Sequence, residues 1–118
     1  NFPLGLTFGP LAAAVAAGNC CMVKLTDLCP ATAKIAGTIV REVFDENEVA
    51  LFEGGVDVAE ALLELPFHHI FFTGSTRVGK IVAAAGPNIG YYLWEFDRPP
   101  NPMASAKIAY NFMSCSSK

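Results

Sequence analysis

His69-Ile-Phe-Phe-Thr-Gly-Ser-Thr-Arg-Val-Gly79 is the stretch of this chain that decides its fold. Residues 70–72 are β-branched or aromatic and predict a buried strand. Residues 73–76 supply turn and N-cap chemistry, and Val78–Ala85 has helical composition. The stretch is therefore typical of a strand that turns directly into a helix.

The start of that helix is a candidate anion site. The backbone N–H groups of Ser75, Thr76 and Arg77 are expected to point at an anion, helped by the helix dipole. We expect Gly74 to allow positive φ and close approach of a phosphate, and Gly79 to let helix and strand pack tightly. The alternative is an ordinary strand-to-helix loop that binds nothing.

Composition indicates one folded domain. Of 118 residues, 53% are hydrophobic and 16% are charged, which is too few charges for a disordered chain. The net charge of −3 is spread along the chain without a basic block, which argues against nucleic acid as a partner. Glycines and prolines interrupt the longest stretch of low charge, residues 1–23, so we expect no membrane-spanning segment.

The cysteines and histidines do not suggest a metal site. No two cysteines form a C-x-x-C pair, and the neighbouring His68 and His69 would face opposite ways on a strand. Reduced thiols and a cytoplasmic location are expected, and no secretory leader follows Asn1. The four cysteines are Cys20, Cys21, Cys29 and Cys115.

Helices and strands alternate along the chain. We expect a first helix that begins at Pro10, runs over Leu11–Ala17 and has Gly18 at its C′ position. The other predicted elements are strands over 20–24, 49–52, 70–72 and 91–94 and helices over 30–43, 58–65 and 78–85. The apolar face of the helix after Pro30 is predicted from Ile35, Ala36, Ile39, Val40 and Val43. This alternation predicts an α/β fold, a parallel sheet with helices on its faces.

Polar segments follow three of the predicted strands, namely Lys24–Asp27, Glu53–Gly55 and Thr73–Thr76. Ligands of parallel sheets bind outside the carboxyl ends of the strands. The three segments together therefore favour a nucleotide site, although the usual G-x-G-x-x-G pattern is absent.

Lys24 and Asp27 are candidates for binding a ribose. A lysine at a strand end can bond ribose hydroxyls, and an acidic residue nearby can accept from a free 2′-hydroxyl, which leans toward NAD. The alternative is a solvated strand end followed by Thr26 or Asp27 as a helix cap.

Four segments together resemble the NAD(P)-dependent aldehyde dehydrogenase superfamily, most closely its coniferyl aldehyde and fatty aldehyde dehydrogenase branch. They are Asn1–Leu4, Gly9–Asn19, Met22–Asp27 and Phe71–Lys80. The resemblance covers nearly all of residues 1–85. It implies a partial aldehyde dehydrogenase fold, a Rossmann-like parallel sheet with flanking helices. Residues 1–95 would be part of the NAD(P)-binding domain, and 96–118 a divergent tail leading toward the catalytic domain.

The resemblance also implies roles for single residues. It assigns NAD or NADP as the cofactor, with Ser75 near the pyrophosphate and Val78 near the adenine. Asn1 matches the asparagine whose amide helps hold the substrate oxyanion. The alternative for Asn1 is a polar residue at the ragged end of a fragment. The cofactor-binding positions are Lys24, Asp27, Gly74, Ser75, Thr76, Val78 and Gly79.

The catalytic residues match the family only in part. Glu95 falls where the family has its general-base glutamate, but Phe96–Pro102 replaces the glycine turn that follows there. An ordinary surface glutamate beside Trp94 is the alternative. Ala104–Met113 resembles the family helix that leads into the catalytic cysteine, whereas the chain ends at Lys118 and Cys115 lies too early. We therefore expect this chain alone to be inactive.

The function that the resemblance implies is oxidation of an aldehyde to its carboxylic acid with NAD(P) as hydride acceptor. The partner would be a small aldehyde, and the parent enzyme a homo-oligomer. The competing hypothesis is a noncatalytic product of a truncated or rearranged gene that retains at most a nucleotide-binding fold.

Overall fold

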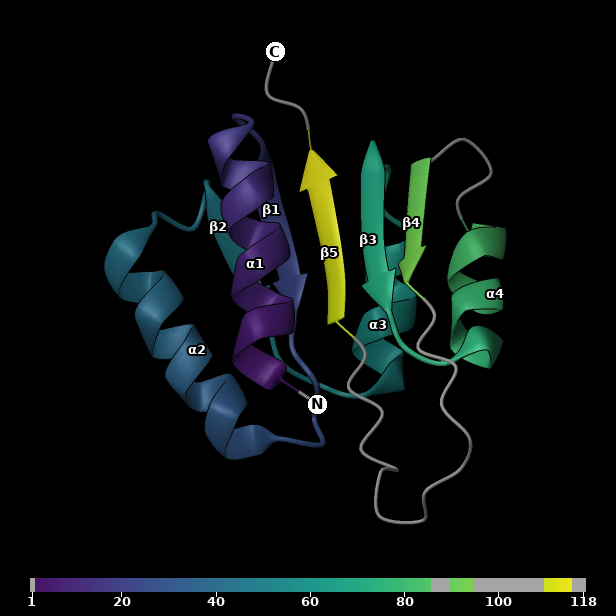
Figure 1. The fold of residues 1–118 in the computed structure, drawn as a ribbon, viewed down its shortest axis with the longest axis horizontal. Coiled ribbons are helices and arrows are strands. Elements are labelled where there is room, and N and C mark those ends of the chain that lie inside the picture. Colours follow the sequence, from purple (N-terminus) through teal and green to yellow (C-terminus); the bar gives the residue numbers. More distant parts are fainter. Residues whose placement is uncertain (1, 86–89, 95–109, 116–118) are drawn as a thin grey trace.

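The computed structural model describes residues 2–85, 90–94 and 110–115. A five-stranded sheet with the order β2-β1-β5-β3-β4 forms its centre, and four helices flank it (Figure 1). The helices are α1 (Pro3–Ala16), α2 (Pro30–Val43), α3 (Val56–Leu63) and α4 (Thr76–Ala85). The strands are β1 (Cys20–Lys24), β2 (Val49–Phe52), β3 (His69–Thr73), β4 (Gly90–Trp94) and β5 (Tyr110–Cys115). The predicted α/β fold with a parallel sheet and flanking helices is thus confirmed.

One strand runs against the others. β1 pairs with β2 in parallel and β3 pairs with β4 in parallel, whereas β5 lies antiparallel between β1 and β3. The comparison of Ala104–Met113 with a family helix is wrong for residues 110–113, which are extended. Pairing with β1 on one side and β3 on the other satisfies the backbone hydrogen-bonding groups of β5. The division of domains at residue 95 stays a prediction.

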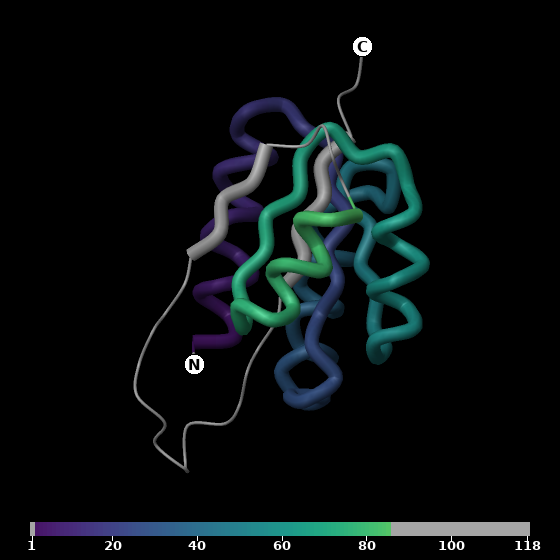
Figure 2. Tube along the Cα trace, turned by 90° about the vertical axis from the view of Figure 1, so that its right-hand side faces the viewer, coloured from purple at the N-terminus to yellow at the C-terminus, as the bar shows by residue number. Residues whose placement is uncertain are grey.

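The helices cover both faces of the sheet, as the edge-on view in Figure 2 shows for α1 and α3. Cys21 and Val23 of β1 belong to a core cluster with residues of α1, α2 and β2, including Leu11 and Val40. Met22, which lies between them, packs instead against a second cluster. This cluster joins α3, β3 and α4 and consists of Leu62, Phe67, Ile70, Phe72 and Val82. The alternation follows from the period of two along a strand.

α1 begins at Pro3 and not at Pro10, which is about two turns earlier than predicted. Pro3 occupies its first turn, and Pro10 lies inside the helix rather than at its start. Both prolines fit the first position of a helix, so local propensity does not choose between them. The end is as predicted, because Gly18 has φ +80° and its N–H donates to the carbonyl of Val15 (2.9 Å), while Asn19 N–H reaches Ala14 O (3.1 Å). This is a Schellman C-cap.

The apolar face of α2 is narrower than predicted. Ala36 and Val40 are buried, but Ile35, Ile39 and Val43 are 57%, 40% and 64% exposed. The buried face consists of Ala33, Ala36, Gly37 and Val40. Small residues on this face let α2 pack closely, which leaves the longer aliphatic side chains outside.

Candidate functional site

The carboxyl ends of β1, β2, β3 and β4 lie at the same edge of the sheet, because these strands are mutually parallel on each side of β5. In Figure 1 this is the lower edge, to which the arrowheads of β1, β3 and β4 point. α1 also begins there. The polar segments that follow β1, β2 and β3 therefore share one edge, as the sequence predicts.

Lys24 is the last residue of β1 and the most unusual polar residue at this edge. Its side chain is only 7% exposed, and among the described residues its ammonium makes no hydrogen bond or ion pair. Burial lowers the pKa of Lys24 below its ordinary value, while the charges of Asp27 and Asp57 partly restore it. A buried ammonium without a protein partner is costly, so a ligand that accepts hydrogen bonds would be held strongly here.

Two carboxylates from different elements converge near Lys24. Asp27 lies in the loop after β1, and Asp57 lies in the first turn of α3. The position that a Cβ of Gly55 would occupy is 3.2 Å from Asp57 Oδ1 and 4.0 Å from Asp27 Oδ2. Both carboxylates are therefore within about 4 Å of one point beside the end of β2.

Asp57 was not among the residues that the sequence singled out. The signal available was an acidic residue two positions after the Gly54-Gly55 pair, where an α-helix begins. Its proximity to Lys24 depends on the pairing of β1 with β2, which places Lys24 opposite Phe52.

The side chain that hydrogen-bonds the backbone of the loop after β1 is that of Thr26 and not that of Asp27. The hydroxyl oxygen of Thr26, which is 6% exposed, accepts from the N–H of Leu28 at 3.2 Å. α2 has Cys29 as its N-cap residue, and that residue makes no side-chain cap. Neither Thr26 nor Asp27 caps α2, so the helix-capping alternative is wrong for both residues. Asp27 is exposed, so a ligand can reach its carboxylate.

The turn between β3 and α4 has Ser75 as its N-cap. The N–H of Val78 donates to Ser75 Oγ at 3.4 Å, and the N–H of Gly79 donates to the Ser75 carbonyl at 2.9 Å. The hydroxyl oxygen of Ser75 thus accepts from one of the backbone N–H groups in the first turn of α4. Thr76 and Arg77, the first two residues of α4, are exposed at the same helix end.

The two glycines of this turn serve packing. Gly74 does not have positive φ, so the expectation of a left-handed turn there is wrong. A Cβ on Gly74 would instead lie 2.5 Å from Cζ of Phe72. Gly79 is buried in α4, and Val78 packs against the second core cluster.

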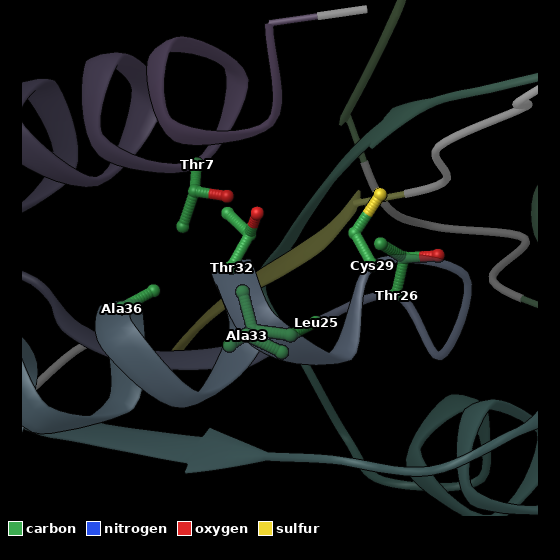
Figure 3. Close-up of a pocket in the computed structure, with 7 residues that line it drawn as sticks. All are labelled: Thr7, Leu25, Thr26, Cys29, Thr32, Ala33 and Ala36. Atoms are coloured by element: carbon green, nitrogen blue, oxygen red, sulfur yellow. The ribbon is translucent and has the colours of Figure 1, made fainter.

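A small cavity lies beside the Lys24–Asp27 loop, between α1 and α2 (Figure 3). Thr7 of α1 and Thr32 of α2 point toward one another across it. Its volume of about 10 Å³ holds about one water molecule and is too small for a ribose. The candidate coenzyme site is therefore the open edge of the sheet and not this cavity.

The two residues predicted to be catalytic have no described position in the structure. Asn1 and Glu95 lie outside the described residues. Within the described part of the chain, no three His, Cys, Asp or Glu side chains lie close enough to hold a metal ion. None of the described helices is both long and apolar enough to cross a membrane.

Comparison with known proteins shows which family the chain matches. Residues 1–95 match the aldehyde dehydrogenase family. AldX of Bacillus subtilis, assigned as an aldehyde dehydrogenase, is 59% identical over 85 residues, which are 72% of this chain and 19% of AldX. The 4,4′-diaponeurosporen-aldehyde dehydrogenase of Staphylococcus aureus is 43% identical over 90 residues, 75% of this chain and 20% of that protein. Coniferyl aldehyde dehydrogenase of a Pseudomonas species is 41% identical over 90 residues, 75% of this chain and 19% of that protein.

A solved structure shows the same fold. The substrate-bound state of Staphylococcus aureus AldH superposes with a TM-score of 0.75 at 39% identity, covering 78% of this chain and 20% of that one. The chain thus spans about a fifth of the length of the relatives it matches. With the family matched over residues 1–95 and the fold shared, this chain belongs to the aldehyde dehydrogenase family.

Proposed function

We propose that this chain supplies coenzyme-binding residues of an enzyme that oxidises an aldehyde to its carboxylic acid with NAD or NADP. Use of NAD(P) is general in the family to which residues 1–95 belong. The observation that carries the proposal for this chain is the burial of Lys24 at the carboxyl end of β1, where its ammonium has no hydrogen-bond or ion-pair partner within the described part of the chain.

The residues at this edge fit a ribose. Lys24 can donate to hydroxyl oxygens, and Asp27 can accept from a hydroxyl group. Hydrogen bonds from Lys24 to a ribose would replace the hydrogen bonds to water that its ammonium lost on burial. This gain favours binding of the ribose. The carboxylate of Asp27 is free to take part, because Thr26 closes the loop in its place.

The start of α4 fits a diphosphate. The helix dipole favours an anion at Ser75 and Thr76, and the neighbouring Arg77 adds a positive charge. Gly74 contributes by its small size, since the ring of Phe72 fills the space that a side chain would need. Val78 and Gly79 hold the first turn of α4 against the sheet.

When bound, the coenzyme would accept the hydride that leaves the aldehyde carbon. Asn1 and Glu95 are proposed, from the family resemblance, to hold the substrate oxyanion and to act as general base. Relatives are named for coniferyl aldehyde and for diaponeurosporen-aldehyde, which are different aldehydes, so we propose an aldehyde substrate without naming one. A cytoplasmic, homo-oligomeric parent enzyme, with residues 1–95 in its coenzyme domain, completes the proposal.

A calorimetric titration of the 118-residue chain with NAD and with NADP tests this function. We expect saturable binding of a coenzyme, and a loss of at least about tenfold in affinity for Lys24→Met, because a charged hydrogen-bond donor is removed. Lys34→Met, on the exposed face of α2, is the matched control and should bind as the parent chain does.

The competing proposal is a noncatalytic gene product. It would be favoured if folded parent protein, checked by circular dichroism, bound neither coenzyme. Equal affinities for the Lys24→Met and Lys34→Met variants would show that a coenzyme binds elsewhere.

A further inference from the structure

We propose that Asp57 is a second acidic residue of the ribose site and that, together with Asp27, it makes this site select NAD over NADP. The proposal rests on the function proposed above, because it concerns the coenzyme that the same site takes. It assigns a role to a residue outside the set predicted from the sequence.

The geometry places both carboxylates around one position. Asp57 Oδ1 and Asp27 Oδ2 lie 3.2 Å and 4.0 Å from the point where a Cβ of Gly55 would be. Gly55 has no side chain, so this position, which lies near both acids, is left clear. The carboxylates belong to separate elements, the loop after β1 and the first turn of α3.

Lys24 lies close to both acids. Its charge interacts with Asp27 and with Asp57, while its side chain is 7% exposed and makes no ion pair among the described residues. The ammonium is therefore near the carboxylates without being neutralised by either in a direct contact. This leaves its hydrogen-bonding capacity for a ligand.

A ribose with two free hydroxyls fits this set of charges. Hydroxyl groups can donate to the carboxylates and accept from the ammonium, and they add no charge. A 2′-phosphate brings nearly two negative charges beside two carboxylates that face one ammonium. Charge repulsion therefore disfavours the phosphorylated coenzyme.

A purely structural role for Asp57 makes a different prediction. An acidic residue in the first turn stabilises a helix through the dipole, whether or not a coenzyme binds. Its removal would then change the stability of α3 and leave the ratio of the two coenzyme affinities unchanged. The ratio of affinities is therefore the informative readout.

The test is calorimetric titration of the parent chain, Asp57→Asn and Glu60→Gln with NAD and NADP. Glu60 lies on the exposed face of the same helix and is the matched control for loss of one negative charge. We expect Asp57→Asn to narrow the preference for NAD over NADP by about tenfold, mainly through tighter NADP binding, because a nearby repulsive charge is lost. Glu60→Gln should keep the preference of the parent.

An unchanged preference in Asp57→Asn, with NAD still bound, overturns this inference and leaves the coenzyme function intact. Binding of neither coenzyme to the parent chain overturns both. Circular dichroism verifies that each variant is folded. If Asp57→Asn does not fold, Asp57→Ser removes the same charge with a residue suited to a helix start, and the same comparison is made with it.

Discussion

Gly74 lies against the aromatic ring of Phe72, so closely that a Cβ on Gly74 would be 2.5 Å from Cζ of that ring. Phe72 is 2% exposed and belongs to the core cluster between β3, α3 and α4. A side chain at Gly74 would therefore require this buried ring to shift. The glycine is therefore required by the packing of this core, independently of any ligand.

Gly74→Ala is expected to lower the free energy of unfolding by about 1–3 kcal/mol, the usual cost of forcing a packed core to shift. Urea unfolding of the variant and the parent measures the difference. Gly9→Ala is the control, because a Cβ at Gly9 would meet no atom within 4 Å. In the interior of α1 it should raise stability by about 0.5–1 kcal/mol. Equal stability of Gly74→Ala and the parent would contradict the packing account.

Ser75→Asp separates helix capping from anion binding. Aspartate caps a helix about as well as serine, so stability should be retained or should rise by a few tenths of a kcal/mol. A carboxylate at this position would repel a diphosphate, and coenzyme affinity should fall by about tenfold or more. Ser75→Asn, a neutral cap, should bind nearly as well as the parent. Equal titrations for the Asp and Asn variants would place the diphosphate elsewhere.

Gly74→Val is a poorer test of binding than the sequence suggests. If the phosphate approaches the backbone closely at Gly74, a valine side chain there blocks the coenzyme. Because the added side chain would also displace Phe72, loss of binding in this variant would combine two causes. The variants at Ser75 avoid the buried ring and report on the anion alone.

Lys24→Met should stabilise the chain while it weakens coenzyme binding. The substitution replaces a buried ammonium by an apolar side chain of similar length and removes the cost of keeping that charge out of water. We expect the free energy of unfolding to rise by about 1 kcal/mol at neutral pH. Urea unfolding without coenzyme checks this. A loss of stability would mean that Lys24 has a structural role that outweighs its burial.

Cys21 should make stability fall at alkaline pH. Burial, with a smaller effect from Cys20, raises the pKa of the Cys21 thiol from 9.0 to about 11. In the unfolded chain the thiol loses its proton near pH 9, whereas the folded chain retains it until about pH 11. The contribution is therefore fully present below pH 9 and is lost as pH rises through this window, by about 2–3 kcal/mol.

Urea unfolding at pH 8 and pH 11 measures that contribution when the parent is compared with Cys21→Ala. The parent should lose about 2–3 kcal/mol more than the variant between the two pH values. Subtracting the change in the variant from the change in the parent cancels the other groups that titrate in this range, Lys24 among them. The same change with pH in both proteins would show that the Cys21 thiol ionises as readily when folded as when unfolded.

Local sequence patterns were sufficient to predict most of the helices and strands. β1, β2 and α2 have the predicted bounds, because glycine, proline and charged loops interrupt each of these apolar runs. α1 was predicted too short, since Pro3 and Pro10 carry the same local signal. The exposed aliphatic side chains of α2 show a further limit of prediction from sequence. Hydrophobic periodicity identifies the apolar face of a helix, but it does not show how much of that face the neighbouring elements cover.

The parts that sequence reasoning missed depend on contacts distant along the chain. β5 is a strand because residues 110–115 lie between β1 and β3, and no short window of sequence reveals those partners. Asp57 joins the site only when β2 pairs with β1 and α3 follows it. Lys24 and Ser75, by contrast, lie at ends of elements whose position local patterns define, so they could be singled out beforehand.

Backbone amide chemical-shift mapping during an NAD titration tests the central claim most directly. It reports where the coenzyme binds in the folded chain, residue by residue. We predict that shifts concentrate in Lys24–Asp27, Gly55–Asp57 and Ser75–Gly79, and that the opposite edge, at Asn19 and Glu48, stays unchanged. Shifts confined to other residues, or none at saturating NAD, would contradict the assignment of the coenzyme to the carboxyl edge of this sheet.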